Sequence, residues 1–295
     1  MRRTERGILA FALLLVTSCT STSSSTNPND VIKSGERPIV VVTYSVLGAI
    51  VSQLVGNSAT VEVLIPDGQD PHEFQPSAKD IEEMNNANIV IANGLQFEEG
   101  LNQGIDSLSN SGVPVFFAGD HVTTRQLGTS KDPHIWTSVA NILELLPALT
   151  RAIGAAIQVD LSEQQAALRS DLTKLDAQII SIIGRLDNCQ LVSGHDEMGY
   201  FAEHYGCVVI GAIIPNFSTT SEATAGELAA LKIQIKEHSV AAIFTGLGTP
   251  QDVANQLAKE LGIKAVSLST HFMNDSGNYQ EFMLRLANQI ANALK

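Results

Sequence analysis

The sequence has little positive charge, few cysteines and few aromatic residues. Lys and Arg number 18 against 31 Asp and Glu in 295 residues, which gives a formal net charge of −13. A chain this acidic offers no basic surface that could release counterions from a phosphate backbone, so nucleic acid is excluded as a partner. Hydrophobic residues at 44% and charged residues at 17% are ordinary for a globular protein and exclude a disordered chain.

Several motifs that identify enzymes and membrane proteins are also missing. The sequence contains no His-Glu-x-x-His helix, no Gly-x-Ser-x-Gly turn and no phosphate-binding loop. No run reaches the roughly 20 apolar residues that a membrane span requires. The sequence therefore favours a binding protein over an enzyme and predicts no integral membrane domain.

The first 18 residues have the layout of a secretory signal. Three arginines precede an apolar run at residues 7–16, and a small residue then precedes Cys19. This arrangement resembles a bacterial lipobox, in which the cysteine becomes the lipid-modified first residue. We therefore predict a signal peptide at 1–18, lipidation at Cys19 and a flexible, Ser- and Thr-rich tether at 19–37. The protein is expected to be exported and lipid-anchored at the cell membrane, facing the periplasm or the cell exterior.

Two cysteines remain in the mature chain. Cys189 and Cys207 each begin an apolar run, and an amphipathic stretch at 197–205 separates the two runs. This is a βαβ pattern with both cysteines at the starting ends of strands that can be neighbours. A disulfide is compatible with this pattern, and so are two buried thiols that act as small core residues.

Short β-branched runs alternate with helical patterns in both halves of the mature chain. Continuous apolar strands between helices indicate parallel sheets that are covered on both faces. We expect two doubly wound α/β lobes, an N-terminal lobe at 38–159 and a C-terminal lobe at 188–295. The expected strands lie at 39–43, 59–65, 89–92, 115–117, 191–193, 208–210, 241–244 and 265–268, and the expected helices include 46–55, 77–86, 97–107, 222–237, 250–261 and 279–294.

One long helix is predicted to join the two lobes. Apolar residues between positions 160 and 187 recur at spacings of three, four and seven, as one stripe on a helix. A packed helix of this length forms a rigid connection, and it restricts hinge motion in a way that a Gly- and Ser-rich linker would not.

The histidines carry the functional information. Four of the seven follow strand runs or lie in Pro-marked loops, where side chains from separate segments converge at the carboxyl ends of strands. These four are His72, His134, His195 and His271, two from each lobe. The other three, His121, His204 and His238, occupy an expected surface loop or helical segments, and we assign them structural roles.

Four imidazoles can complete the tetrahedral shell that Zn²⁺ prefers. An all-nitrogen set favours zinc over manganese, which suits carboxylate and water ligands better. The fourth position is the least secure, because Asp275 or water could replace His271 there. If His271 does not bind the metal, the zinc ion keeps an open position for water, and Glu197 could act as the general base. The protein would then be an envelope-anchored zinc hydrolase, which is the alternative from a different functional class.

From residue 38 to the end, the sequence resembles the cluster A-I (ZnuA/TroA-like) metal-binding lipoproteins of bacterial ABC importers for zinc or manganese. The shared motifs are Pro-His-x-Phe-x-Pro at His72, Asp-Pro-His-Ile-Trp at His134 and His-Asp-Glu-Met-Gly-Tyr-Phe at His195. The resemblance implies a non-enzymatic, monomeric solute-binding protein that delivers a divalent metal to a permease. It places the first three ligands on these histidines, whereas many relatives have Asp where His271 stands. Many zinc importers also carry a His-rich loop near residues 119–131, where this chain has only His121.

Overall fold

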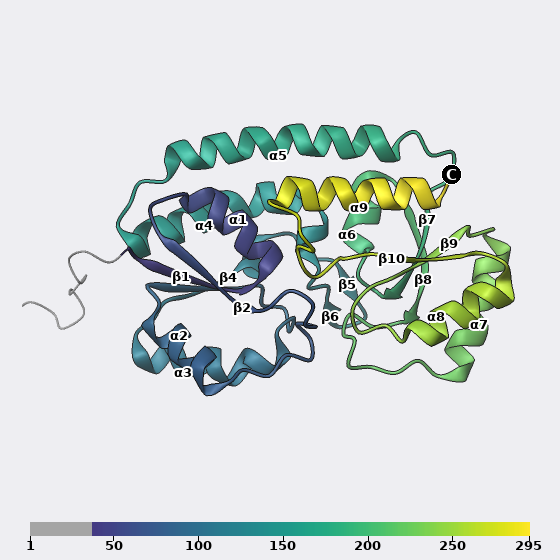
Figure 1. Cartoon of the computed structure of the whole chain (residues 1–295), viewed down its shortest axis with the longest axis horizontal. Coiled ribbons are helices and arrows are strands. Elements are labelled where there is room, and N and C mark those ends of the chain that lie inside the picture. The colour runs from purple at the N-terminus through teal and green to yellow at the C-terminus, as the bar shows by residue number, and fades with distance from the viewer. Residues whose placement is uncertain (1–36) are drawn as a thin grey trace, which may run out of the picture. The chain divides into compact units, whose positions relative to one another are not determined.

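The computed structural model describes residues 37–295, and these form one compact unit. The predicted signal peptide, Cys19 and all but the last residue of the predicted tether lie outside the described residues. Two four-stranded parallel sheets with their helices make up the fold (Figure 1). We call the parts built on these sheets the N-terminal and C-terminal lobes.

The first sheet has the strand order β2-β1-β3-β4, with every pair parallel. Its central strand β1 buries three consecutive valines, because helices cover both faces of the sheet. Helices α1 and α4 lie on one face and α2 and α3 on the other (Figure 1). The strands are β1 (Ile39–Tyr44), β2 (Thr60–Ile65), β3 (Ile89–Ala92) and β4 (Val115–Phe117), and the helices are α1 (Ser45–Val55), α2 (Ala78–Asn86), α3 (Asn102–Ser111) and α4 (Val139–Ile157).

The second sheet repeats this topology with the order β10-β9-β7-β8, again parallel throughout. Its elements are β7 (Gln190–His195), α6 (Gly199–Tyr205), β8 (Val208–Ile214), α7 (Ala225–Glu237), β9 (Ala242–Thr245), α8 (Gln251–Leu261), β10 (Lys264–Ser267) and α9 (Tyr279–Ala293). Two parallel sheets enclosed by helices confirm the predicted α/β class.

Each sheet has a point where the order of connection reverses. From β1 the chain crosses to β2 on one side and later to β3 on the other, and β7 stands in the same relation to β8 and β9. At such a point two loops leave neighbouring strand ends in opposite directions, which opens a crevice at the carboxyl edge of the sheet. This edge of each sheet is therefore the expected location of a ligand.

The long helix α5 (Ser162–Ile183) follows α4 and leads to the second sheet. Its buried residues form one stripe at spacings of three and four, which pack against α4, α1 and α9. Figure 1 shows α9, the last helix of the C-terminal lobe, running beside α5 towards α1. One continuous apolar core therefore extends from β1 across α5 to α9.

The predicted helix at 97–107 begins later than expected. The carboxylate of Glu98 accepts hydrogen bonds from the backbone N–H groups of Asn93 at 2.7 Å and Gly94 at 3.1 Å. These bonds hold a tight turn after β3, in which Leu95 and Gln96 have positive φ. A short 3₁₀ turn follows, and α3 starts only at Asn102.

Helix α4 is long and apolar enough to cross a membrane by length and composition. In the structure it packs against α5, and it buries residues such as Leu145, Leu149 and Ile153 completely. It is therefore a core helix of the N-terminal lobe.

A disulfide joins Cys189 and Cys207, whose Cα atoms lie 4.6 Å apart. The bridge lies next to the first residues of the neighbouring strands β7 and β8, where the backbone N–H of Val208 also bonds the carbonyl of Cys189. His195 is the last residue of β7, so the bridge and this histidine lie at opposite ends of the strand.

Removing the bridge should lower stability while leaving metal binding intact. The bridge closes a loop with a sequence separation of 18, which predicts a loss of about 3 kcal/mol in the free energy of unfolding. Urea titration of the Cys189→Ser/Cys207→Ser variant measures this loss, with the wild type in reductant as the matched comparison. An unchanged unfolding midpoint would contradict the prediction.

Candidate metal centre

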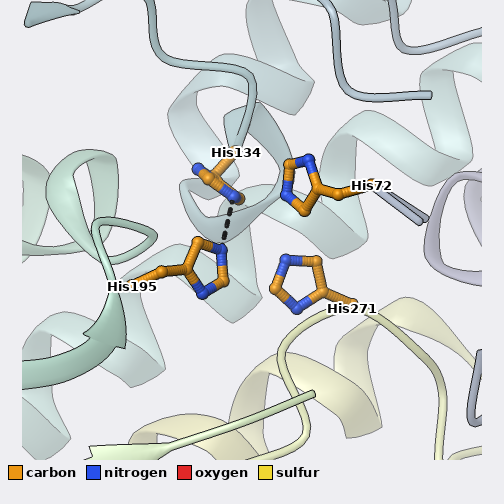
Figure 2. A group of neighbouring side chains, drawn as sticks. All are labelled: His72, His134, His195 and His271. Atoms are coloured by element: carbon orange, nitrogen blue, oxygen red, sulfur yellow. Dashed lines mark hydrogen bonds between the residues drawn. The ribbon is translucent and has the colours of Figure 1, made fainter. Parts of the chain in front are cut away.

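The structure brings the four predicted histidines together. Each ring offers one nitrogen, and these four nitrogens lie within 4.8 Å of one another. All four residues are almost completely buried, with exposed fractions of 0 to 2%. Figure 2 shows the rings of His72, His134, His195 and His271 arranged around one point.

Each ring reaches this point from the carboxyl edge of a sheet. His195 ends β7, and His271 follows β10 after a short loop. His72 lies in the loop after β2, and His134 follows a small hairpin made by β5 (Gln126–Leu127) and β6 (Ser130–Lys131). Both lobes therefore contribute two rings from the edge where parallel sheets bind ligands.

A local turn of the sequence Asp-Pro-His positions both histidines of the N-terminal lobe. The Oδ1 atom of Asp70 accepts the backbone N–H of His72 at 3.0 Å, and Asp132 does the same for His134 at 3.0 Å. In each turn the aspartate side chain accepts the backbone N–H of the histidine two residues later, as a backbone carbonyl would in an ordinary turn. The proline between them has a fixed φ, which limits the conformations of the turn. The same short sequence therefore holds two rings in defined places.

Hydrogen bonds show which nitrogen of His134 faces the centre. Its Nδ1 lies 2.8 Å from Oδ1 of Asp132. Because an ionised carboxylate only accepts, Nδ1 carries the proton and Nε2 keeps its lone pair. That Nε2 lies 3.1 Å from Nε2 of His195. Two nitrogens bound to one tetrahedral zinc ion would lie about 3.3 Å apart, so the spacing suits a shared cation.

The two histidines of the C-terminal lobe turn their Nδ1 atoms away from the centre. Oxygen atoms of Glu197 lie 3.8 Å from Nδ1 of His195 and 3.5 Å from Nδ1 of His271. The same carboxylate accepts a 2.5 Å hydrogen bond from the hydroxyl of Thr270. Burial raises the pKa of Glu197 to about 7, although the Thr270 bond opposes this shift. Glu197 therefore lies behind the rings, outside the space that the four nitrogens surround.

Nε2 of His134 and Nε2 of His195 are hydrogen-bonded to each other (Figure 2), but the other two rings have no such partner at the centre. Within the described part of the chain, Nε2 of His271 and both ring nitrogens of His72 are buried without a hydrogen bond. A buried polar atom without a partner is uncommon in a folded protein and points to a ligand or ion. Four imidazole nitrogens are a donor set that fits a tetrahedral cation.

Aromatic rings enclose the centre. Phe97 stacks on His271 with ring centroids 5.9 Å apart, and Trp136 lies 5.6 Å from the same ring. Burial, reinforced by the nearby His134, lowers the pKa of His72 from 6.5 to about 3 and lowers the pKa of His195 and His271 well below 6.5. These three rings are therefore neutral at pH 7, which is the form that binds metal.

The remaining candidates lie outside the cluster found among residues 37–295. His121 stacks on Phe116 with centroids 4.5 Å apart, His204 hydrogen-bonds Asp176 at 2.8 Å, and His238 caps the exposed end of α7. Asp275, the alternative fourth ligand, is not part of the cluster either. Sequence reasoning gave no role to Asp132, although its place two residues before His134 signals the turn described above.

The fold and the buried four-nitrogen centre define the class of metal-binding solute-binding proteins. The family of ZnuA proteins, described as zinc-uptake complex component A, periplasmic, matches residues 40–293, and the chain belongs to this family. Its members are non-enzymatic solute-binding proteins of metal ABC transporters. The resemblance seen in the sequence is therefore confirmed.

Individual relatives of the chain bear the names of different metals. The manganese-binding lipoprotein MntA of Halalkalibacterium halodurans is 24% identical over 78% of this chain and 78% of its own length. The iron ABC transporter substrate-binding lipoprotein MtsA of Streptococcus pyogenes is 25% identical over 87% of this chain and 85% of its own. Among solved structures, the periplasmic zinc-binding protein TroA of Treponema pallidum has the same fold, with a TM-score of 0.79 and 24% identity. The match covers 88% of this chain and 99% of the TroA chain.

Membership of this family excludes the hydrolase alternative. The geometry gives the physical reason, because the carboxylate of Glu197 faces the Nδ1 side of the rings and accepts the Thr270 hydroxyl. In that place it cannot activate a water bound to the cation.

Acid should destabilise the metal-free protein through its buried imidazoles. The pKa of His72 is about 3 in the folded protein, whereas an imidazole exposed to water in the unfolded chain has a pKa of 6.5, so the unfolded chain binds the proton more tightly. The free energy of unfolding should therefore fall as the pH drops from 6.5 towards 3, and each unit of pKa difference corresponds to about 1.4 kcal/mol.

Urea unfolding in chelator across this pH range measures the effect. The His72→Ala variant should show a shallower pH slope than the wild type, whereas His238→Ala, which alters an exposed histidine, should keep the full slope. Equal slopes in the wild type and His72→Ala would disprove the assignment.

Proposed function

We propose that this protein captures Zn²⁺ outside the cytoplasm and delivers it to the permease of an ABC transporter. The observation that carries the proposal is the buried set of four imidazoles whose nitrogens lie within 4.8 Å of one another. His72, His134, His195 and His271 are the proposed ligands. The ion is cargo, so the site has to hold it and release it unchanged.

The ligand set supports zinc over manganese and iron. Four neutral nitrogen donors suit a borderline ion with a tetrahedral shell, whereas Mn²⁺ prefers carboxylate and water oxygens. Asp132 and Glu197 are engaged behind the rings, Asp132 by Nδ1 of His134 and by Arg125, and Glu197 by the hydroxyl of Thr270. The alternative within the family is a manganese-binding protein, which would need oxygen ligands that the centre does not contain among the described residues.

Zinc binding should be stoichiometric and depend on each histidine. We expect one Zn²⁺ per chain, and Ala in place of His134 or His195 should weaken binding by about a hundredfold or more, because losing even an outer partner of a metal-bound histidine costs about 10- to 100-fold. Competition with a chelating dye measures the affinity, and His121→Ala is the control for a histidine outside the centre. Anomalous diffraction at the zinc edge, on protein purified without added metal, identifies the ion. A folded wild type that binds Mn²⁺ more tightly than Zn²⁺ would refute the proposal.

His271 should determine the metal preference. A carboxylate at this position would add a harder, anionic oxygen ligand, so His271→Asp should raise the affinity for Mn²⁺ relative to Zn²⁺ by about tenfold or more. Asp275→Asn is the matched control, because Asp275 lies outside the cluster. If His271→Asp leaves the ranking unchanged and Asp275→Asn alters it, Asp275 is the fourth ligand.

The protein is proposed to act as a monomer that lipid holds at the cell membrane. Relatives named lipoproteins support this proposal, together with the sequence around Cys19. Cys19→Ala should move the protein from the membrane fraction to the soluble fraction without changing its zinc affinity. Immunoblots of the two fractions test this, and retention of the variant at the membrane would count against lipidation.

A further inference from the structure

The two Asp-Pro-His turns of the metal centre differ in the partners of their aspartate carboxylates. Asp132 bonds the ring of its histidine, whereas the ring of His72 makes no hydrogen bond within residues 37–295. The second oxygen of Asp132 lies 2.6 Å from Nη1 of Arg125, whereas the carboxylate of Asp70 pairs with no arginine in the same range and interacts with the hydroxyl of Thr219. The carboxylate that orients an imidazole is therefore the one that an arginine engages.

The hairpin before His134 brings this arginine into place. Strands β5 and β6 pair with a two-residue loop, in which Gly128 has a φ of +61°, as tight hairpin turns require. One step beyond the paired residues, the backbone N–H of Asp132 donates to the carbonyl of Arg125 at 2.9 Å. The hairpin lies within residues 119–131, the segment in which the family resemblance implies a His-rich loop for many zinc importers. Here the same segment places Arg125 opposite Asp132.

The C-terminal lobe holds the other side of the arginine. Nε of Arg125 lies 3.2 Å from Oε2 of Glu203 on α6, and its guanidinium carbon lies 5.6 Å from the ring centre of Tyr200. The Tyr200 hydroxyl accepts the backbone N–H of Arg125 at 3.0 Å and donates to the carbonyl of Asp132 at 2.9 Å. Helix α6 therefore contacts both ends of the hairpin.

Gly199, the first residue of α6, leaves room for the guanidinium. A Cβ atom at this position would lie 1.4 Å from Nη1 and 2.1 Å from Cζ of Arg125. Any larger residue would push the guanidinium out of its place. The close approach of Arg125, a residue of the N-terminal lobe, thus explains why the His-Asp-Glu-Met-Gly motif has a glycine at position 199.

We propose that Arg125 is a positioning residue of the metal centre, acting through Asp132 on His134. Its charge engages Oδ2 of Asp132, which leaves Oδ1 to accept the Nδ1 proton of His134, so that Nε2 faces the cation. Because α6 holds Arg125, the orientation of a ligand from the N-terminal lobe depends on contact with the C-terminal lobe. The inference rests on the proposed function, and it assigns to Arg125 an effect on the affinity of the centre for Zn²⁺.

Arg125→Gln tests the role of the charge. A cavity of about 480 Å³ lies beside Arg125, Tyr200 and Glu203, so the shorter side chain can be accommodated. We expect a loss of Zn²⁺ affinity of about tenfold, at the lower end of the 10- to 100-fold range for a direct partner of a metal-bound histidine, because Arg125 acts one contact further out. The visible absorption spectrum of the Co²⁺-loaded protein should change as well, and Arg125→Lys should restore part of the affinity. Arg151→Gln, on the exposed side of α4, is the control and should match the wild type.

Double variants test whether Arg125 acts through Asp132. Asp132→Asn should weaken binding as Arg125→Gln does, and the double variant should bind no more weakly than Asp132→Asn alone. Asp252→Asn, at an exposed position in the first turn of α8, is the control. It should match the wild type, because Asp252 is not part of the cluster of four histidines or of either Asp-Pro-His turn.

Gly199→Ala displaces the guanidinium while keeping the arginine. It should reproduce the loss of affinity seen in Arg125→Gln, and it decides the question if Arg125→Gln fails to fold. Gly226→Ala in α7 is the matched helical control, because a Cβ there meets only the Thr224 hydroxyl at 3.9 Å.

Two results would overturn the inference. One is an Arg125→Gln protein whose Zn²⁺ affinity stays within about threefold of the wild type with an unchanged Co²⁺ spectrum. The other is a double variant in which the losses from Arg125→Gln and Asp132→Asn multiply. A folded wild type that binds neither Zn²⁺ nor Co²⁺ would instead refute the proposed function.

Discussion

A nitrogen lone pair buried away from water needs a donor or a cation, and in this protein several such lone pairs face one point. Nε2 atoms of His134 and His195 lie 3.1 Å apart, and Nε2 of His271 has no hydrogen-bond partner in the described chain. Four rings can be held this close only if their backs are fixed by other groups. The Asp-Pro-His turns, the Glu197–Thr270 pair and the aromatic wall of Phe97 and Trp136 do so.

The two lobes meet around the centre through buried polar contacts as well as apolar ones. Nε1 of Trp136 donates to the carbonyl of Thr270 at 2.7 Å, and the hydroxyl of Tyr279 donates to the carbonyl of Trp136 at 2.7 Å. Trp136 follows His134, a proposed ligand, by two residues, and Thr270 directly precedes His271, another proposed ligand. The groups that hold the lobes together are therefore neighbours of the groups that would hold the ion.

The pattern of the sequence was sufficient to predict the sheets and the convergence of the four histidines, because both depend on local signals. Apolar β-branched runs such as Val40–Val42 predict buried strands, and a histidine after such a run or in a Pro-His turn predicts a ligand at a strand end. The delayed start of α3 escaped prediction because it depends on how Glu98 bonds the backbone of Asn93 and Gly94. The contact between Arg125 and Gly199 joins segments far apart in the sequence, and no local pattern encodes it.

The four proposed ligands are spread along almost the whole folded chain. His72 lies near its beginning and His271 near its end, with two sheets and the long helix α5 between them. An unfolded or partly translocated chain offers only isolated imidazoles, which bind a cation weakly. The ion can therefore be acquired only in the compartment where the chain completes folding, and a chain truncated before the loop that follows β10 would lose a ligand. Binding competence would thus report that the chain has folded through the loop that follows β10.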